Sequence, residues 1–196
     1  MKRLLKFIIF IFFSLIYKVE LLGKENIPKK GAAILCANHI FALDIFSVGS
    51  GLKRLVHFMA KEELFRNPIL APLIRWFGAF PVKRGKADVG AIKTAIKLLE
   101  KEHIIGIFPQ GTRTRGKDIS DISIQRGVVM IAINAGVPIT PVGIKATYKP
   151  FSKVKVVFGK PFYLNIEKGK KCSREEMNEF AKNLMDKVYE LVEDND

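Results

Sequence analysis

The chain has few cysteines and a shortage of acidic residues, and each scarcity argues against a class of protein. Its 196 residues include two cysteines, Cys36 and Cys172, which lie far apart. That spacing argues against a disulfide framework and against a metal site, and it fits a reducing compartment. The 19 acidic residues are outnumbered by 33 lysines and arginines, so the net charge is +14. Such a charge predicts anionic partners: nucleic acid, anionic lipid or a phosphorylated substrate.

Familiar signatures of catalysis and of nucleic-acid binding are missing as well. The sequence has no G-x-x-x-x-G-K-[ST] phosphate loop, so nucleotide hydrolysis is not predicted. It has no serine or cysteine in a nucleophile elbow, so no covalent intermediate is predicted. It has no nucleic-acid-binding motif, and its basic residues are spread along the chain, which argues against a non-enzymatic basic protein. No internal repeat or linker is present, and the length suits one domain.

An apolar segment with basic residues on both sides opens the chain. Residues 4–17 are mostly apolar, but this run falls short of the about 20 residues that cross a bilayer. No small-residue cleavage site follows, as a signal peptide would require. We expect residues 1–18 to form a membrane-associating helix at the interface, with the folded domain in residues 19–196. A tilted single span and a core helix are the alternatives.

Beyond this segment, short apolar runs alternate with amphipathic stretches. Buried or core strands are predicted at residues 32–37, 55–60 and 104–108, and further strands at residues 79–82, 138–144 and 154–158, after a short strand and turn at residues 18–28. Helices are predicted at residues 43–50, 88–102, 125–135 and beyond a capping box at residues 173–176. The alternation predicts an α/β fold, a sheet with helices on its faces. Two prolines, Pro138 and Pro141, predict that their strand is kinked or lies at an edge.

A histidine and an aspartate follow the first of the central strands. His39 stands where this strand ends, and Asp44 comes five residues later. Residues five apart on one helix point about 140° away from each other, so a bonded pair needs His39 on the loop and Asp44 in the first helical turn. A carboxylate bonded to one ring nitrogen leaves the other as a general base. The alternative is a helix-capping Asp44 beside a structural His39.

Two more strand ends lead into loops that are rich in hydrogen-bond donors. Residues 83–86 are Lys-Arg-Gly-Lys, which could receive a phosphate or could form a solvated loop. In the loop after residues 104–108, Gly111 permits close backbone approach, Thr112 adds a hydroxyl, and Arg113 offers a bidentate fork. If the three loops converge, the site combines a general base with two anion contacts.

Four short blocks, in order along the chain, match the blocks of a known family. They are Asn38-His39-x4-Asp44, Phe80-Pro81-Val82-Lys83-Arg84, Phe108-Pro109-Gln110-Gly111-Thr112-Arg113 and Val137-Pro138-Ile139-Thr140-Pro141-Val142. Any one block is weak evidence, but four in this order are strong. Over about residues 19–160 the chain therefore resembles the glycerolipid acyltransferase family, specifically the bacterial 1-acyl-sn-glycerol-3-phosphate acyltransferases.

The resemblance implies a fold and a reaction. The fold is a central, mostly parallel mixed sheet flanked by helices, with residues 19–196 as the acyltransferase domain. His39, oriented by Asp44, would take the proton from the sn-2 hydroxyl of lysophosphatidate. That oxygen would attack the thioester of acyl-CoA or acyl-carrier protein, giving phosphatidate without any further cofactor. The place of action would be an anionic membrane, the cytoplasmic face of the bacterial inner membrane.

The resemblance also implies a set of substrate-binding residues. Arg84 and Arg113 would bind the acceptor phosphate, while Gly111 and Thr112 would shape that pocket. The matching motif positions add three further members to this set, which are Asn38, Lys83 and Gln110.

Three departures from the family pattern bear on activity. Gln110 replaces a glutamate, so it keeps an acceptor and the shape but lacks the charge and cannot act as a base. If the glutamate only forms hydrogen bonds, activity survives. If the charge of the glutamate is needed, either the activity falls or the reaction differs. The acceptor would then be another lysophospholipid or an aminolipid, or the acyl group would move between phospholipids. Thr114 replaces a serine, and Arg126 stands close to where relatives carry a lysine.

Overall fold

A mostly parallel sheet with helices on both faces forms the body of the protein. The computed structural model describes residues 2–49, 51–83, 88–114 and 122–193. The helices are α1 (Lys2–Ile16), α2 (Asp44–Gly49), α3 (Leu70–Trp76), α4 (Val89–Glu100), α5 (Gly127–Ala135) and α6 (Arg174–Glu193), with 3-10 turns η1 (Lys24–Asn26) and η2 (Glu62–Arg66). The strands are β1 (Lys18–Leu22), β2 (Ala33–Ala37), β3 (Val56–Lys61), β4 (Phe80–Val82), β5 (Ile104–Ile107), β6 (Ile139–Ala146) and β7 (Lys153–Phe158).

Within the described residues the strands form one sheet in the order β1-β7-β6-β2-β5-β3-β4. Every neighbouring pair is parallel except β6 and β7, which are antiparallel. The predicted α/β class with a mostly parallel mixed sheet is therefore confirmed. β2 lies at the centre, between β6 and β5, so the chain that leaves its carboxyl end emerges in the middle of the sheet.

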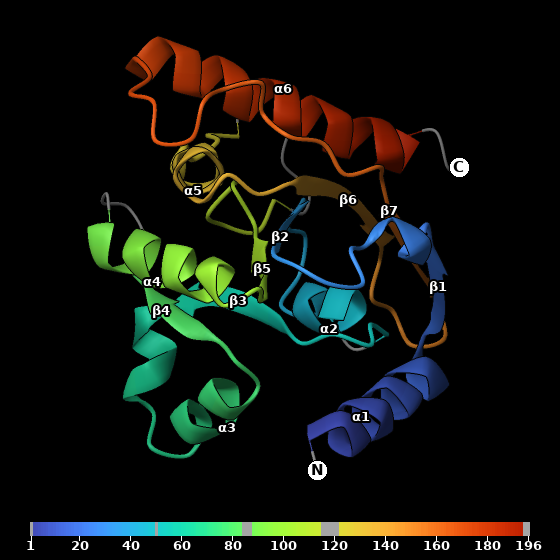
Figure 1. The fold of residues 1–196 in the computed structure, drawn as a ribbon. Coiled ribbons are helices and arrows are strands. Elements are labelled where there is room, and N and C mark those ends of the chain that lie inside the picture. Colours follow the sequence, from blue (N-terminus) through green and yellow to red (C-terminus); the bar gives the residue numbers. More distant parts are fainter. Residues whose placement is uncertain (1, 50, 84–87, 115–121, 194–196) are drawn as a thin grey trace.

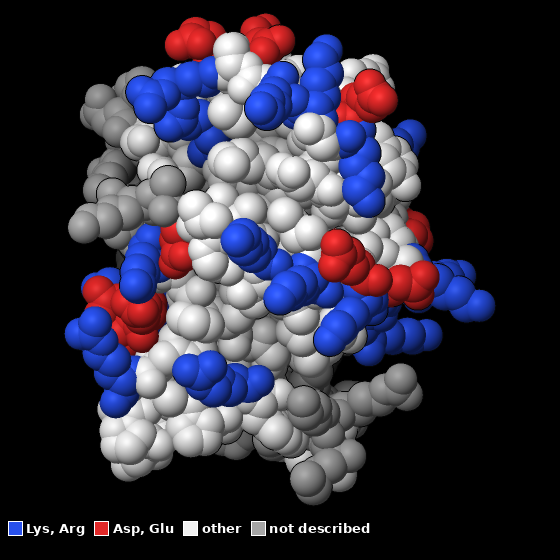
Figure 2. All heavy atoms as spheres, turned by 60° about the vertical axis from the view of Figure 1, so that its left-hand side comes forward, with Lys and Arg blue, Asp and Glu red and all other residues white. Residues whose placement is uncertain are grey.

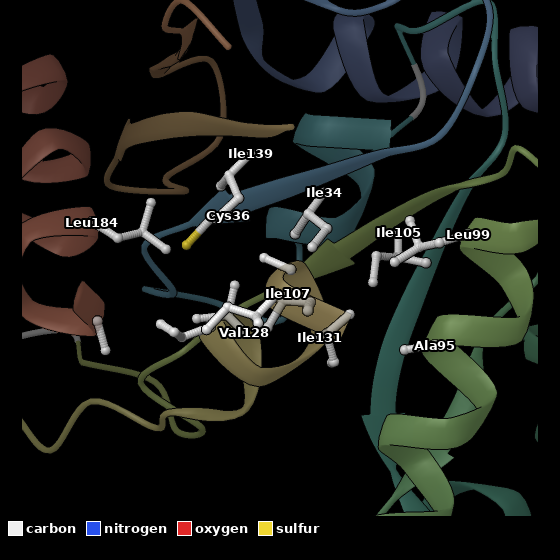
Figure 3. Close-up of a cluster of buried hydrophobic side chains, with 14 of the residues drawn as sticks. Ile34, Cys36, Ala95, Leu99, Ile105, Ile107, Val128, Ile131, Ile139 and Leu184 are labelled. Carbon is white, nitrogen blue, oxygen red and sulfur yellow. The ribbon is translucent and has the colours of Figure 1, made fainter. Parts of the chain in front are cut away.

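Alternate residues of β2 divide the core into two clusters. Ile34 and Cys36 face the side covered by α4, α5 and α6, whose side chains close this cluster (Figure 3). Leu35 and Ala37 face the other side, where α1 and α2 lie (Figure 1). Burying one such aliphatic side chain contributes about 1.5–3 kcal/mol. A one-residue slip would exchange the two faces, so the pattern fixes the register of β2.

β6 shows where a local sequence rule failed. Its prolines predicted a kinked or edge strand, yet β6 is interior, between β7 and β2, so the edge expectation was wrong. The carbonyl of Pro141 accepts from the N–H of Gly159, which places the absent N–H of Pro141 on the β7 side. The β6–β7 ladder begins one residue later, at Val142 and Phe158. Pro141 therefore stands at the end of this ladder, where the sheet forgoes only the one bond that an N–H at this position would donate to Gly159.

The N-terminal segment forms α1, which ends at Ile16. Phe13 turns inward and joins the core cluster on the α1–α2 side. Other apolar side chains of α1 are instead well exposed, among them Leu4, Ile8, Phe12 and Leu15. Among the helices that the structure describes, none combines the length and hydropathy needed to cross a bilayer.

Candidate active site

The loops that leave β2 and β5 lie side by side. These strands are parallel and in register, with Cys36 opposite Ile107, so both loops emerge at the same edge of the sheet. The ring of His39 stacks on the ring of Phe108, with centroids 4.3 Å apart and planes at 21°. The carbonyl of His39 accepts from the N–H and hydroxyl of Thr114, at 2.8 and 3.0 Å. The first and third of the four sequence blocks therefore meet at His39.

His39 and Asp44 form a buried, hydrogen-bonded pair. Nδ1 of His39 lies 2.7 Å from Oδ2 of Asp44, with His39 on the loop and Asp44 in the first turn of α2. The same oxygen accepts the backbone N–H groups of Ile40 and Phe41, at 2.7 and 2.8 Å. An oxygen that accepts two backbone donors favours the tautomer with the proton on Nδ1. Nε2 of His39 is then left with its lone pair, as a general base requires.

Two hydroxyl groups complete the surroundings of Asp44. Its other oxygen, Oδ1, accepts from the hydroxyl of Tyr148 at 2.7 Å. The Tyr148 hydroxyl also lies 2.8 Å from the hydroxyl of Ser47. Burial and the charge of Asp44 raise the pKa of Tyr148, so this hydroxyl stays protonated and able to donate. No sequence signal pointed to Tyr148, because it is 104 residues from Asp44.

Asn38 has an architectural role. Its amide nitrogen donates to the carbonyl of Ile144 at 2.9 Å, and its amide oxygen accepts the N–H of Ile144 at 2.7 Å. This pair of bonds ties the end of β2 to β6, directly before His39. The substrate contact that the family resemblance implied for Asn38 stays a prediction, since both ends of its amide are engaged within the protein.

Gln110 is also engaged within the protein. Its side-chain oxygen accepts the backbone N–H of His39 at 2.5 Å, and its amide nitrogen donates to the hydroxyl of Tyr189 at 2.7 Å. Gly111 follows with a φ of 62°, a left-handed conformation that suits glycine, and its N–H bonds to the carbonyl of Phe108 at 3.0 Å. This tight turn fixes the direction in which the loop leaves β5.

A cavity of about 810 Å³ opens beside this loop. Its polar lining includes Lys83, Gln110, Gly111 and Thr112, joined by two cations that the site prediction did not include, Arg126 and Arg174. Its apolar lining includes Met59, Ile92, Ile107, Val128 and Met177. Arg113, His39 and Asp44 are not among the residues that line this cavity, but two lining residues, Phe108 and Gln110, contact His39.

The two described residues that flank residues 84–87, Lys83 and Asp88, are bonded to each other. Asp88 accepts the N–H of Lys83 through Oδ2 at 2.8 Å and caps α4 by accepting the N–H of Ala91 through Oδ1 at 3.0 Å. These backbone donors, Lys83 first, lower the pKa of Asp88. Arg84, the predicted phosphate ligand, lies outside the described residues. In the described part of the chain, no group of three His, Cys, Asp or Glu side chains could hold a metal ion.

Known proteins are similar to this chain in both sequence and fold. The family model described as Acyltransferase matches residues 18–145. A 1-acyl-sn-glycerol-3-phosphate acyltransferase of Bacillus subtilis is 35% identical over 152 residues, covering 74% of each chain. A protein of the same name from Borreliella burgdorferi is 33% identical over 155 residues, 76% of this chain and 60% of its own length.

A solved structure agrees with these sequence matches. The crystal structure of the 1-acyl-sn-glycerophosphate (LPA) acyltransferase PlsC from Thermotoga maritima has a TM-score of 0.66 and 28% identity, covering 93% of this chain and 74% of that one. The family match takes in the His39–Asp44 pair and the Gln110 loop that carry the site. On this ground the chain belongs to the acyltransferase family.

Proposed function

We propose that the protein transfers a fatty acyl group from an acyl thioester to the sn-2 hydroxyl of 1-acyl-sn-glycerol-3-phosphate. The observation that carries the proposal is the buried His39–Asp44 pair, whose 2.7 Å bond leaves Nε2 of the imidazole as a base. The names of the Bacillus subtilis and Thermotoga maritima relatives supply the acceptor, since both denote acylation of the same lysolipid.

The reaction follows from the chemistry of these groups. Nε2 of His39 takes the proton of the sn-2 hydroxyl as its oxygen attacks the thioester carbonyl carbon. Asp44 stabilises the imidazolium that forms, as a carboxylate partner does in other histidine bases. When the carbon–sulfur bond breaks, the imidazolium returns its proton to the leaving thiolate. One O–H and one C–S bond are exchanged for one C–O and one S–H bond.

The cavity supports binding of a molecule with both charge and apolar length. Lys83, Arg126 and Arg174 supply positive charge to its lining, and Gly111 and Thr112 supply a turn and a hydroxyl. Its apolar residues suit an acyl chain, as drug-sized and lipid sites are mostly apolar with few polar groups. We assign Arg84 and Arg113 to the acceptor phosphate on the family pattern. No cofactor beyond acyl-CoA or acyl-carrier protein is part of the proposal.

The test is acyl transfer by the unaltered protein with two donors and several acceptors. Lysophosphatidate would be offered with acyl-CoA and with acyl-carrier protein, beside lysophosphatidylcholine, lysophosphatidylethanolamine and an aminolipid. We expect phosphatidate as the main product. Transfer to another lysolipid but not to lysophosphatidate would show that the acceptor is a different lysophospholipid or an aminolipid, the alternative raised by glutamine at position 110. No transfer to any acceptor would contradict an enzymatic role for the site.

We further propose that α1 rests in an anionic membrane surface on the cytoplasmic side. This placement is supported by the exposed apolar residues of α1. It is also supported by two exposed apolar residues at α3, which are Ile69 directly before the helix and Leu73 within it. Both helices lie along the lower side of the molecule in Figure 1. Basic side chains are spread over the face shown in Figure 2, and the net charge is +14. Each basic residue near such a surface contributes about 1 kcal/mol.

Phe12→Asp tests this placement, since the side chain of Phe12 is 66% exposed on α1. We expect binding to phosphatidylglycerol vesicles to weaken about tenfold or more, since burying a phenyl ring contributes about 1.5–3 kcal/mol. Tyr163→Asp is the control, because Tyr163 is similarly exposed at 63% and lies outside α1. Vesicle co-sedimentation measures both variants. Equal binding by Phe12→Asp and the parent would contradict a membrane contact through α1.

A further inference from the structure

The C-terminal helix reaches the proposed base through two side chains. Gln110 is 3% exposed, so its amide is effectively out of water. One end of that amide holds the backbone N–H of His39, and the other end is held by the hydroxyl of Tyr189 on α6. A chain of two hydrogen bonds therefore joins α6 to His39, across 79 residues of sequence from Gln110 to Tyr189.

The backbone of His39 is clamped at both of its polar groups. Its N–H is bonded to Gln110, and its carbonyl is bonded twice to Thr114. Both partners belong to the loop that follows β5. Asp44 and Phe108 hold the imidazole ring, and Gln110 holds the backbone N–H from which the ring is carried, so the rotamer of Gln110 contributes to where the imidazole stands relative to a substrate.

Tyr189 is suited to hold this rotamer whichever polar group stands at position 110. Burial raises the pKa of Tyr189, so its hydroxyl is neutral and can both donate and accept. Here it accepts from the amide nitrogen of Gln110 at 2.7 Å. A glutamate at this position has no N–H, but the same hydroxyl could turn and donate to the carboxylate. Tyr189 on α6 can therefore stay in the same place whether position 110 holds glutamine or glutamate.

We propose that Tyr189 is a positioning residue for His39, acting through Gln110. This inference rests on the proposed function in one respect, namely that His39 is the base. It assigns to the third family block a role in orienting the histidine backbone. It also explains how glutamine is accommodated in place of glutamate, since both a glutamine amide and a glutamate carboxylate can accept the N–H of His39 and pair with Tyr189.

The first experiment compares the kinetics of Tyr189→Phe with two controls. We expect kcat to fall about tenfold and KM for both substrates to stay within about twofold, because displacing a reacting group lowers the rate more than substrate affinity. Tyr163→Phe removes an exposed hydroxyl elsewhere. Val188→Ala removes buried methyl groups from the neighbouring position of α6 and should lower the melting temperature without the fall in kcat.

The second experiment reads the bond without using activity. Tyr189→Phe is made in the parent and in Gln110→Glu, and melting temperatures are measured at pH 8 and pH 5.5. At pH 8 we expect the loss of the hydroxyl to lower the melting temperature about twice as much in the Gln110→Glu background, since bonds to a charged group are roughly twice as strong. A buried carboxylate without its donor has a raised pKa, so acidification should shrink this difference.

The outcomes separate this inference from the proposed function. Equal melting losses in both backgrounds at both pH values would show that Tyr189 does not hold residue 110. A kcat that falls only as it does in Val188→Ala would show a purely structural tyrosine, and either result overturns the inference. A parent with no acyl transfer contradicts the proposed function instead, and the melting comparison still decides whether Tyr189 holds position 110.

Discussion

We expect His39→Ala to lower kcat for acyl transfer by at least about 10³-fold, within the range that general-base catalysis supplies. An alkyl hydroxyl is a poor nucleophile at neutral pH, and Nε2 of His39 is the acceptor that the Asp44 bond leaves available. The imidazole is nearly buried, so water cannot easily take its place as a base. KM for lysophosphatidate should change little, because the cations that line the cavity come from other residues.

His103→Ala is the matched control for this substitution. His103 precedes β5, so it lies at the amino end of the strand, whereas the His39 loop contacts the carboxyl end. Its ring contacts His57, 4.8 Å away between centroids, and no atom of the cavity lining belongs to it. Steady-state kinetics with purified, folded protein measures both variants. Comparable activity of His39→Ala and His103→Ala would overturn His39 as the base.

The sequence predicts those parts of the site whose residues lie only a few positions apart in the chain. A strand followed by His39 and, five residues later, by Asp44 constrains both residues, and the structure places them on the loop and in the first turn of α2. The alternation of Ile34 and Leu35 likewise sets which face of β2 each side chain covers. Both inferences need only the geometry of one strand and one helical turn.

The parts that the sequence did not predict depend on contacts between distant segments. Tyr148 reaches Asp44 across 104 residues, and Tyr189 reaches Gln110 across 79. Locally, the sequence indicates only that Tyr189 lies four residues after Met185 on α6, and therefore on the same, buried face of this helix. β6 was misplaced for a related reason. The prolines show only which N–H groups β6 lacks. Whether a neighbouring strand needs those N–H groups depends on the order of the strands in the sheet, which the sequence of β6 does not contain.

Asp44→Asn should lower kcat by about 10²-fold while the protein remains folded, less than the about 10⁴-fold loss that occurs when such a substitution also leaves the histidine in the wrong tautomer. The structure makes this a nearly pure test of charge. The asparagine oxygen can take the place of Oδ2 and accept the same three N–H groups, which belong to Ile40, Phe41 and His39. The two backbone donors hold the oxygen toward His39, so the proton stays on Nδ1.

The N–H₂ group of the asparagine also finds a hydrogen-bond partner, because the hydroxyl of Tyr148 can change from donor to acceptor at this position. The asparagine N–H₂ would donate to Tyr148, whose hydroxyl would then donate to Ser47, 2.8 Å away, while Ser47 keeps its bond to the carbonyl of Leu43 at 3.3 Å. Every polar group stays paired, so we expect only a small change in melting temperature. What is lost is the negative charge that stabilises the imidazolium.

Tyr148→Phe shows whether this reversal takes place. In the parent it removes one donor to Asp44 and should lower kcat only severalfold, because Oδ2 and its three N–H donors are untouched. In Asp44→Asn it leaves the amide N–H₂ buried without a partner, which costs about 1–3 kcal/mol. Turning the amide over does not relieve this cost, because its nitrogen would then face the backbone N–H groups of Ile40 and Phe41. The double variant should therefore lose more melting temperature than the sum of the two single losses, and strict additivity of the melting losses would contradict the hydroxyl reversal.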